Sequence, residues 1–267
     1  MMSALFESLV NNSMILLPLE LDNENPLEGG ELENYARAGN KEGPQFKLQL
    51  DDKDVNLEEL EDLMEYFRLK MVRELWLDRN DFGDVGVGLL SDAKSLSGLR
   101  VLSLAGNKLT NSAFYALANS KVLVALKRLF VQFNFLGHEG LDALCQSESM
   151  ASLEFLYLKQ NPLGPAGAKT LASSSSFENI KELYLGRTQL GNDGLSALCS
   201  GRTWQNLTAL SLAQNGLDDK AATMLAESKI FPKLVTLDLY GNPMGDEAIS
   251  IIKKSPNLTC LRALQTN

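Results

Sequence analysis

Residues 126–144 read LKRLFVQFNFLGHEGLDAL, and this stretch decides the fold. In its first half the apolar side chains alternate around Leu129, which is typical of a short β-strand. After Gly137 the apolar residues return at helical spacing. Asn134 marks the turn between the two halves. The stretch therefore predicts a unit of one strand followed by one helix.

The same unit recurs at a fixed step of 27 residues. Its central leucine falls at Leu48, Leu75, Leu102, Leu129, Leu156, Leu183, Leu210 and Leu237. The next equivalent is expected at Leu261, 24 residues further on, after a shortened helix over about residues 246–254. Eight copies in phase predict about eight stacked repeats plus a terminal strand.

The slot pattern L-x-x-L-x-L-x-x-N-x-L resembles that of leucine-rich repeats. A 27-residue period with a helix in every unit is similar to the ribonuclease-inhibitor-type subclass. The resemblance covers about residues 46–264. Parallel strands lie about 4.8 Å apart and packed helices about 8–10 Å apart. The expected fold class is therefore α/β: a leucine-rich-repeat horseshoe solenoid with a parallel concave sheet and convex helices.

Residues 1–45 do not follow the repeat, and we expect them to form an acidic N-terminal cap on an array over residues 46–267. A cap is needed because the first strand would otherwise expose an unpaired edge. Within it, residues 19–21 are expected to form a strand and residues 30–38 a short helix. Residues 1–65 hold 16 acids and 4 bases, whereas the remainder holds 18 and 21. A solvated cap is the simpler interpretation, and an acidic docking surface is the alternative.

Three columns of residues have structural roles. The amide column is expected to bond backbone groups where each strand turns away. It comprises Asn80, Asn107, Asn134, Asn161, Asn215 and Asn242. Thr188 replaces Asn and can partly serve, whereas Lys53 predicts an imperfect turn in the first repeat. The helix-entry column is expected to turn or cap the helices; it comprises Gly83, Thr110, Gly137, Gly164, Gly191, Asp218 and Gly245. Small residues three positions later, such as Gly86 and Gly140, are expected to let each helix lie close to its strand.

Catalytic and metal sites are not expected. The glycines of residues 83–88 fit no phosphate-binding pattern. Cys145 and Cys199 fall in a column of small, buried helix residues, and Cys260 is assigned to the last strand. The single histidine, His138, is expected on a solvated helix entry. We therefore predict no catalytic residues, no metal and no cofactor.

Partner and compartment follow from charge and hydropathy. A net charge of −9 argues against nucleic acid as a partner. No segment is apolar enough to span a membrane, so no membrane partner is expected. No basic residue precedes Arg37, which argues against a secretory signal and favours a cytoplasmic location.

The candidate binding site lies on the concave face. Residues between the two core leucines of each strand point there, and we extend their column to Arg262, with Cys260 in the neighbouring column. The predicted site combines aromatic and basic residues: Trp76, Arg128, Phe130, Phe133, Phe155, Tyr157, Lys159, Tyr184 and Arg187. Shallow zones of small residues are expected on both sides, around Ser103 and around Ser211.

Aromatic residues and arginine dominate binding hot spots, so the sequence favours a non-enzymatic protein–protein interaction scaffold with a partner protein on the concave sheet. A cross-strand aromatic ladder that only stiffens the sheet is the structural alternative. Self-association through the same residues is another. Analogy with Ran GTPase-activating proteins, which look similar in repeat type, offers a regulator of GTP hydrolysis. A host-directed effector is the last alternative, also by fold analogy.

Overall fold

The computed structural model describes residues 2–18, 43–174 and 176–267. Its strands form one open ten-stranded sheet in chain order. They are β1 (Met14–Leu16), β2 (Phe46–Gln49), β3 (Val72–Trp76), β4 (Val101–Ser103), β5 (Arg128–Phe130), β6 (Phe155–Tyr157), β7 (Glu182–Tyr184), β8 (Ala209–Ser211), β9 (Thr236–Asp238) and β10 (Ala263–Gln265). From β2 onward all neighbours are parallel.

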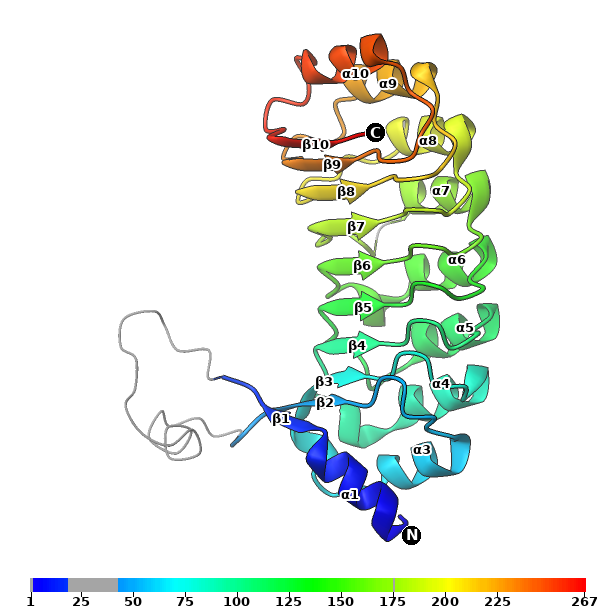
Figure 1. Ribbon diagram of the computed structural model, residues 1–267, viewed down its shortest axis with the longest axis vertical. Helices are drawn as coiled ribbons and strands as arrows, with labels where there is room; N and C mark the ends of the chain where they lie inside the picture. Colours follow the sequence, from blue (N-terminus) through cyan, green and yellow to red (C-terminus); the bar gives the residue numbers. More distant parts are fainter. Residues whose placement is uncertain (1, 19–42, 175) are drawn as a thin grey trace, which may run out of the picture.

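Helices alternate with the strands and line the opposite side of the molecule (Figure 1). They are α1 (Ala4–Asn12), α3 (Leu57–Met64), α4 (Gly83–Asp92), α5 (Asn111–Asn119), α6 (His138–Gln146), α7 (Gly164–Ser173), α8 (Gly191–Cys199), α9 (Asp219–Glu227) and α10 (Asp246–Lys253). Short 3-10 turns cover Leu69–Met71, Lys94–Leu96 and Glu148–Met150. The predicted fold class is confirmed. Below, the concave face means the face of the sheet turned away from the helices.

The 27-residue register holds to the end of the described chain. Leu264 pairs with Leu237 across β9 and β10, so the terminal strand is centred on Leu264 and not on Leu261. The assignment of Arg262 and Cys260 to the concave columns was therefore wrong. Gln265 and Ala263 occupy those places, and Cys260 lies before the strand. The error arose because Leu258, Leu261 and Leu264 are equally spaced, so Leu261 also fits the slot three residues earlier.

The N-terminal end is covered by α1 and β1. Phe6 and Val10 of α1 are buried in the same core as the repeats, and β1 pairs antiparallel with β2. The Tyr66 hydroxyl donates to Asn11 Oδ1 at 2.6 Å. The strand predicted at residues 19–21 and the helix predicted at residues 30–38 lie outside the described residues.

The buried asparagines form a hydrogen-bonded ladder, as predicted. Asn134 Oδ1 accepts the backbone N–H groups of Asn107 and Leu109, both at 3.0 Å. Its amide donates to the carbonyls of Leu104 and Val131, both at 3.0 Å. Each asparagine thus completes the turn of the preceding repeat as well as its own, which removes the cost of burying unpaired backbone groups.

Two other columns behave partly as expected. The side chains of Thr110 and Asp218 cap α5 and α9, as predicted. The small residues three positions later lie close to the turn before their own helix and to the neighbouring helix; at Gly194 the nearest atom to an added Cβ is Leu190 Cβ at 3.0 Å. A Cβ added at Gly194 would lie 3.3 Å from Pro165 Cα and 3.2 Å from Ala168 Cβ, both on the neighbouring α7.

Candidate functional site

Four aromatic rings form a row across the concave face. The centroids of Phe130 and Tyr157 lie 4.3 Å apart, and those of Tyr157 and Tyr184 also lie 4.3 Å apart. The interplanar angles of these two pairs are 22° and 8°. These residues are in register on β5, β6 and β7, so the inter-strand spacing itself places the rings in stacking contact. Because the faces cover one another, the row presents mainly ring edges to solvent.

Trp76 joins the row across an intervening strand. Its indole reaches the Phe130 ring at 5.2 Å, although Ser103 of β4 lies between them in register. Ser103 is completely buried as a result. The shallow zone predicted around Ser103 is therefore wrong: a large side chain leans over the small one and closes the gap.

Cations cover several aromatic faces. Lys47 Nζ lies 4.5 Å from the centroid of the Trp76 ring and caps the β2 end of the row. Arg128 Cζ lies 4.5 Å from the centroid of Phe155, one column away from the row. Such contacts contribute about 0.5–2 kcal/mol, depending on desolvation. Lys47 was not among the predicted site residues, although its position beside Trp76 in the predicted columns was a usable signal.

Glu182 links the two tyrosines. Its Oε2 accepts the Tyr184 hydroxyl at 2.9 Å and the Tyr157 hydroxyl at 3.3 Å. Burial, and after it the Glu182 carboxylate, raise the pKa of both phenols above the ordinary value. Glu182 was also missed by sequence reasoning, because a glutamate on a strand is by itself most simply a solvated residue.

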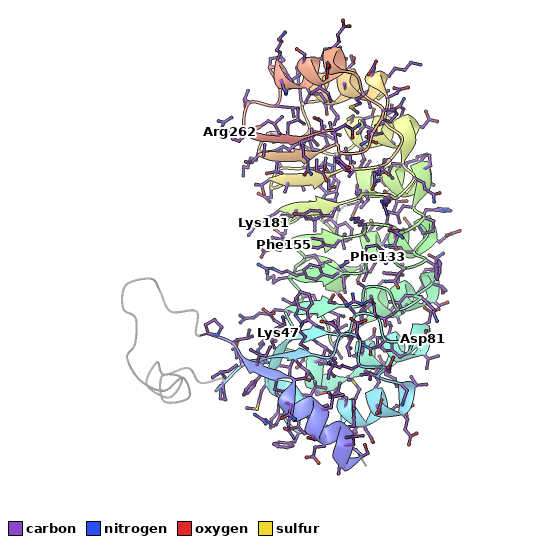
Figure 2. All side chains as sticks on the ribbon, viewed as in Figure 1. Lys47, Asp81, Phe133, Phe155, Lys181 and Arg262 are labelled. Atoms are coloured by element: carbon purple, nitrogen blue, oxygen red, sulfur yellow. The ribbon has the colours of Figure 1, made fainter. Side chains whose placement is uncertain are left out.

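The remaining predicted residues border the turn that follows the strands. Phe133 has a left-handed backbone (φ 60°) and a side chain that is 47% exposed. Lys159 Nζ lies 5.9 Å from the centroid of the Phe133 ring. Arg187 Nε donates to Gln214 Oε1 at 2.5 Å. Figure 2 shows Phe155 at the starting end of the strands and Phe133 beyond their far end, toward the helices.

Arg128, Lys159 and Arg187 have no carboxylate within 4.0 Å among residues 2–18, 43–174 and 176–267. Some cations elsewhere in the array are paired: Arg79 lies 2.5 Å from Asp52, and Lys108 lies 2.6 Å from Asp81. These three cations thus lie beside the aromatic row without an ion-pair partner in the described part of the chain, while the Glu182 carboxylate lies at the two tyrosine hydroxyls.

The other chemically interesting residues are dispersed. Within the described part of the chain no group of three or more His, Cys, Asp and Glu side chains is arranged to hold a metal ion. Cys145 is buried, and burial raises the pKa of its thiol to about 12. His138 is exposed at the start of α6, as predicted, with Nδ1 3.6 Å from Glu139 Oε2. None of the helices in the described ranges has the length and apolar character needed to cross a bilayer.

Residues 178–199 and 205–226 match the family described as Leucine Rich repeat. A chain of the yeast Rad7–Elc1 complex is similar in structure, with a TM-score of 0.50 and 18% identity over 80% of this chain and 58% of that one. The fold of this chain is that of a leucine-rich-repeat solenoid. No curated protein matches it in sequence.

Two further leucine-rich-repeat neighbours are more distant. An internalin from Listeria monocytogenes gives a TM-score of 0.48 and 20% identity over 79% of this chain and 65% of that one. The plant peptide hormone receptor RGFR1, solved in complex with RGF2, gives a TM-score of 0.44 and 18% identity over 85% of this chain and 36% of that one. This leucine-rich-repeat chain therefore spans less than two thirds of each of these three structures. At such identities the likeness shows the fold alone.

Proposed function

We propose that the chain is a non-enzymatic, cytoplasmic scaffold that binds a partner protein on its concave face. The observation that carries the proposal is the aromatic row of Trp76, Phe130, Tyr157 and Tyr184, which is continuous over five strands and partly exposed. Large, rigid rings supply contact area at a low cost in side-chain entropy. A row that only stiffened the sheet would not need unpaired cations around it.

The partner surface we envisage is apolar with acidic groups at its rim. Arg128, Lys159 and Arg187 would pair with these groups, and Phe133 and Phe155 would extend the apolar contact. Stacked rings also argue against nucleic acid, because successive bases need several free ring faces on which to stack. The similar yeast structure is a protein complex by its own description, which accords with protein binding but identifies no partner here.

We also place the array, over residues 46–267, in the ribonuclease-inhibitor-type subclass, on its 27-residue period with a helix in each repeat. Residues 1–45 would act as its acidic cap. The subclass presents an uninterrupted strand-lined face, so the partner would contact several repeats at once.

The test is affinity capture from the native lysate with wild type and with the double variant Tyr157→Ala/Tyr184→Ala. We expect the captured partner to be lost with the double variant. Tyr115→Ala is the matched control, because Tyr115 is exposed on α5 away from the sheet. A partner retained by a folded double variant would contradict the proposal.

Two parallel measurements address the alternatives. Light scattering on the purified wild-type protein would reveal self-association, and loss of that association in the double variant would make a second copy the partner. Acceleration of GTP hydrolysis in a panel of small GTPases would instead support the regulator.

A further inference from the structure

The two terminal rings of the aromatic row differ in what covers their outer faces. At the β2 end the outer face of Trp76 is covered by the Lys47 ammonium. At the other end the last ring, Tyr184, stacks on Tyr157 with one face only. In the described parts of the chain no aromatic or cationic group covers its second face. The row therefore ends in an open aromatic face directed along the sheet toward β8.

A slot lies beyond that face. Ser211 follows Tyr184 in register on β8, and Asp238 follows Ser211 on β9. The two walls, Tyr184 and Asp238, are thus separated by two strand spacings, about 9.6 Å at the backbone. Ser211 forms the floor, and its hydroxyl donates to Asp238 Oδ2 at 2.7 Å. The neighbouring columns on β8 hold only the small residues Ala209 and Ala213, and the large Tyr240 lies beyond Asp238, where it is 51% exposed.

The serine on the other side of the row shows that such a gap can be closed. Over Ser103 the gap is filled by the Trp76 indole, which reaches Phe130. Over Ser211 the residue on the far strand is the shorter Asp238, whose carboxylate accepts the Ser211 hydroxyl at 2.7 Å and the Tyr240 backbone N–H at 3.0 Å. The slot lies above Ser211, which is itself only 6% exposed, and it has one aromatic wall and one carboxylate wall.

The charges around the slot are negative. Asp238 forms one wall, and Glu182 lies on the same strand as Tyr184 with its Oε2 on the phenol oxygen. The nearby cations point elsewhere. Lys159 Nζ is directed toward the Phe133 ring on the β5 side, and Arg187 is bound to Gln214 in the turn after β8.

We propose that this slot receives an arginine side chain of the partner protein. The guanidinium plane would stack on the open face of Tyr184 and donate to the Asp238 carboxylate. Arginine suits both walls because it is flat, permanently charged and a fork-shaped donor. The chain already uses this pairing internally, with Arg128 over Phe155 and Arg202 over Trp204, each at 4.5 Å. The inference rests on the proposed function and adds the residue that the partner supplies.

The first experiment uses N-acetyl-arginine amide as the probe, titrated to millimolar concentrations into the full-length, isotope-labelled protein and followed by amide chemical shifts. We expect saturable shifts confined to β7, β8 and β9. The citrulline analogue, which is isosteric but uncharged, should bind at least fivefold more weakly. Acetyl-tryptophan amide and acetyl-glutamate amide test the other occupants, and tighter binding of either would overturn the proposal. So would arginine shifts spread evenly over the acidic surface.

Variants sharpen the assignment. Ser211→Tyr fills the slot with a ring of the kind that the column already holds in β6 and β7, and should abolish arginine binding. Ser211→Ala keeps the slot open, so the affinity for the arginine probe should stay within twofold of wild type. Asp238→Asn retains the shape and the hydrogen-bond acceptor but removes the charge, and should weaken binding at least fivefold. Asp92→Asn, at an exposed position on α4, is the charge control.

The same variants separate this inference from the proposed function. Once a partner that needs Tyr157 and Tyr184 has been captured, Ser211→Tyr and Asp238→Asn should each reduce its capture. If both variants bind it as wild type does, the arginine slot is wrong and the scaffold stands. If the aromatic double variant also binds it, the scaffold itself is wrong.

Discussion

The rings of Tyr157 and Tyr184 lie 4.3 Å apart and within 8° of parallel. This separation is slightly shorter than the spacing of the strands that carry them, about 4.8 Å, so the two side chains lean together. Stacking of this kind contributes about 0.5–1.5 kcal/mol for each pair beyond area burial. The row consequently stabilises the sheet as well as forming a surface. A variant that removes a ring should therefore lose stability as well as contact area.

The pH dependence of the row is set by its tyrosines. Because burial and Glu182 raise their pKa values in the folded state, their contribution to stability is complete below the unfolded pKa of about 10. It is lost as the pH rises through the folded values. We expect Glu182→Gln to bring the late-ionising tyrosines to lower pH in an ultraviolet absorbance titration and to soften the alkaline loss of stability. An unchanged titration would mean that the carboxylate has no such effect.

Removing one rung of the asparagine ladder should be costly. Asn134→Ala strips partners from buried backbone N–H groups and carbonyls in two adjacent repeats. Each buried group left unpaired costs about 1–3 kcal/mol. The Val131 carbonyl keeps the Asn161 amide, so for the other three groups we expect a total loss of about 3–9 kcal/mol. Urea unfolding measures it. Asn119→Ala is the control, because its amide bonds an exposed helix carbonyl. Equal midpoints for the two variants would refute the structural role of the ladder.

Two glycine-to-alanine substitutions should change the stability of the protein in opposite directions. At Gly201 a Cβ would lie 2.5 Å from Ala172 Cβ and 2.7 Å from its carbonyl oxygen, so the backbones must separate and the melting temperature should fall. At Gly88, inside α4, a Cβ meets nothing within 4 Å. There alanine should stabilise the helix by about 0.5–1 kcal/mol. Calorimetry of the two variants measures both melting temperatures. A shift in the same direction for both variants would contradict the packing described at these glycines.

Thiol reactivity should follow burial. Cys145 is 3% exposed and its thiol pKa is raised to about 12, so almost no thiolate exists at neutral pH. We expect Cys145 to remain unmodified by iodoacetamide at pH 8 in the native protein and to react fully in urea. Mass spectrometry of the peptide carrying Cys145 provides the readout. Rapid native labelling would place the thiol at the surface.

The repeat could be predicted from the sequence because its constraint is periodic. Each central leucine is buried in the same environment, so the 27-residue step from Leu48 to Leu237 was unambiguous. The ends lack that redundancy. At the N-terminal end, β1 (Met14–Leu16) pairs antiparallel with β2 and does not follow the repeat pattern. At the C-terminal end, three evenly spaced leucines made the register ambiguous, although Leu264 is the residue that pairs with Leu237.

The candidate site could be predicted only as a set of columns. Strand alternation placed Phe130, Tyr157 and Tyr184 in one row, and the structure brings them into contact. Sequence could not indicate that Trp76 leans across Ser103, because this depends on side-chain torsions that the register leaves free. It also could not single out Glu182, whose importance depends on the two hydroxyls that reach it.

The asparagine ladder has a direction. Asn107 Oδ1 accepts the N–H of Asn80 in the preceding repeat, and its amide donates back to the Leu77 carbonyl of that repeat. Each turn that is followed by an asparagine-bearing repeat is thus completed by that repeat. A chain emerging from the ribosome makes repeats in that same order, so we expect each turn to become ordered only after about 27 further residues have appeared. Folding during translation would then lag synthesis by one repeat, and a stalled ribosome would always hold one incomplete turn at the growing end.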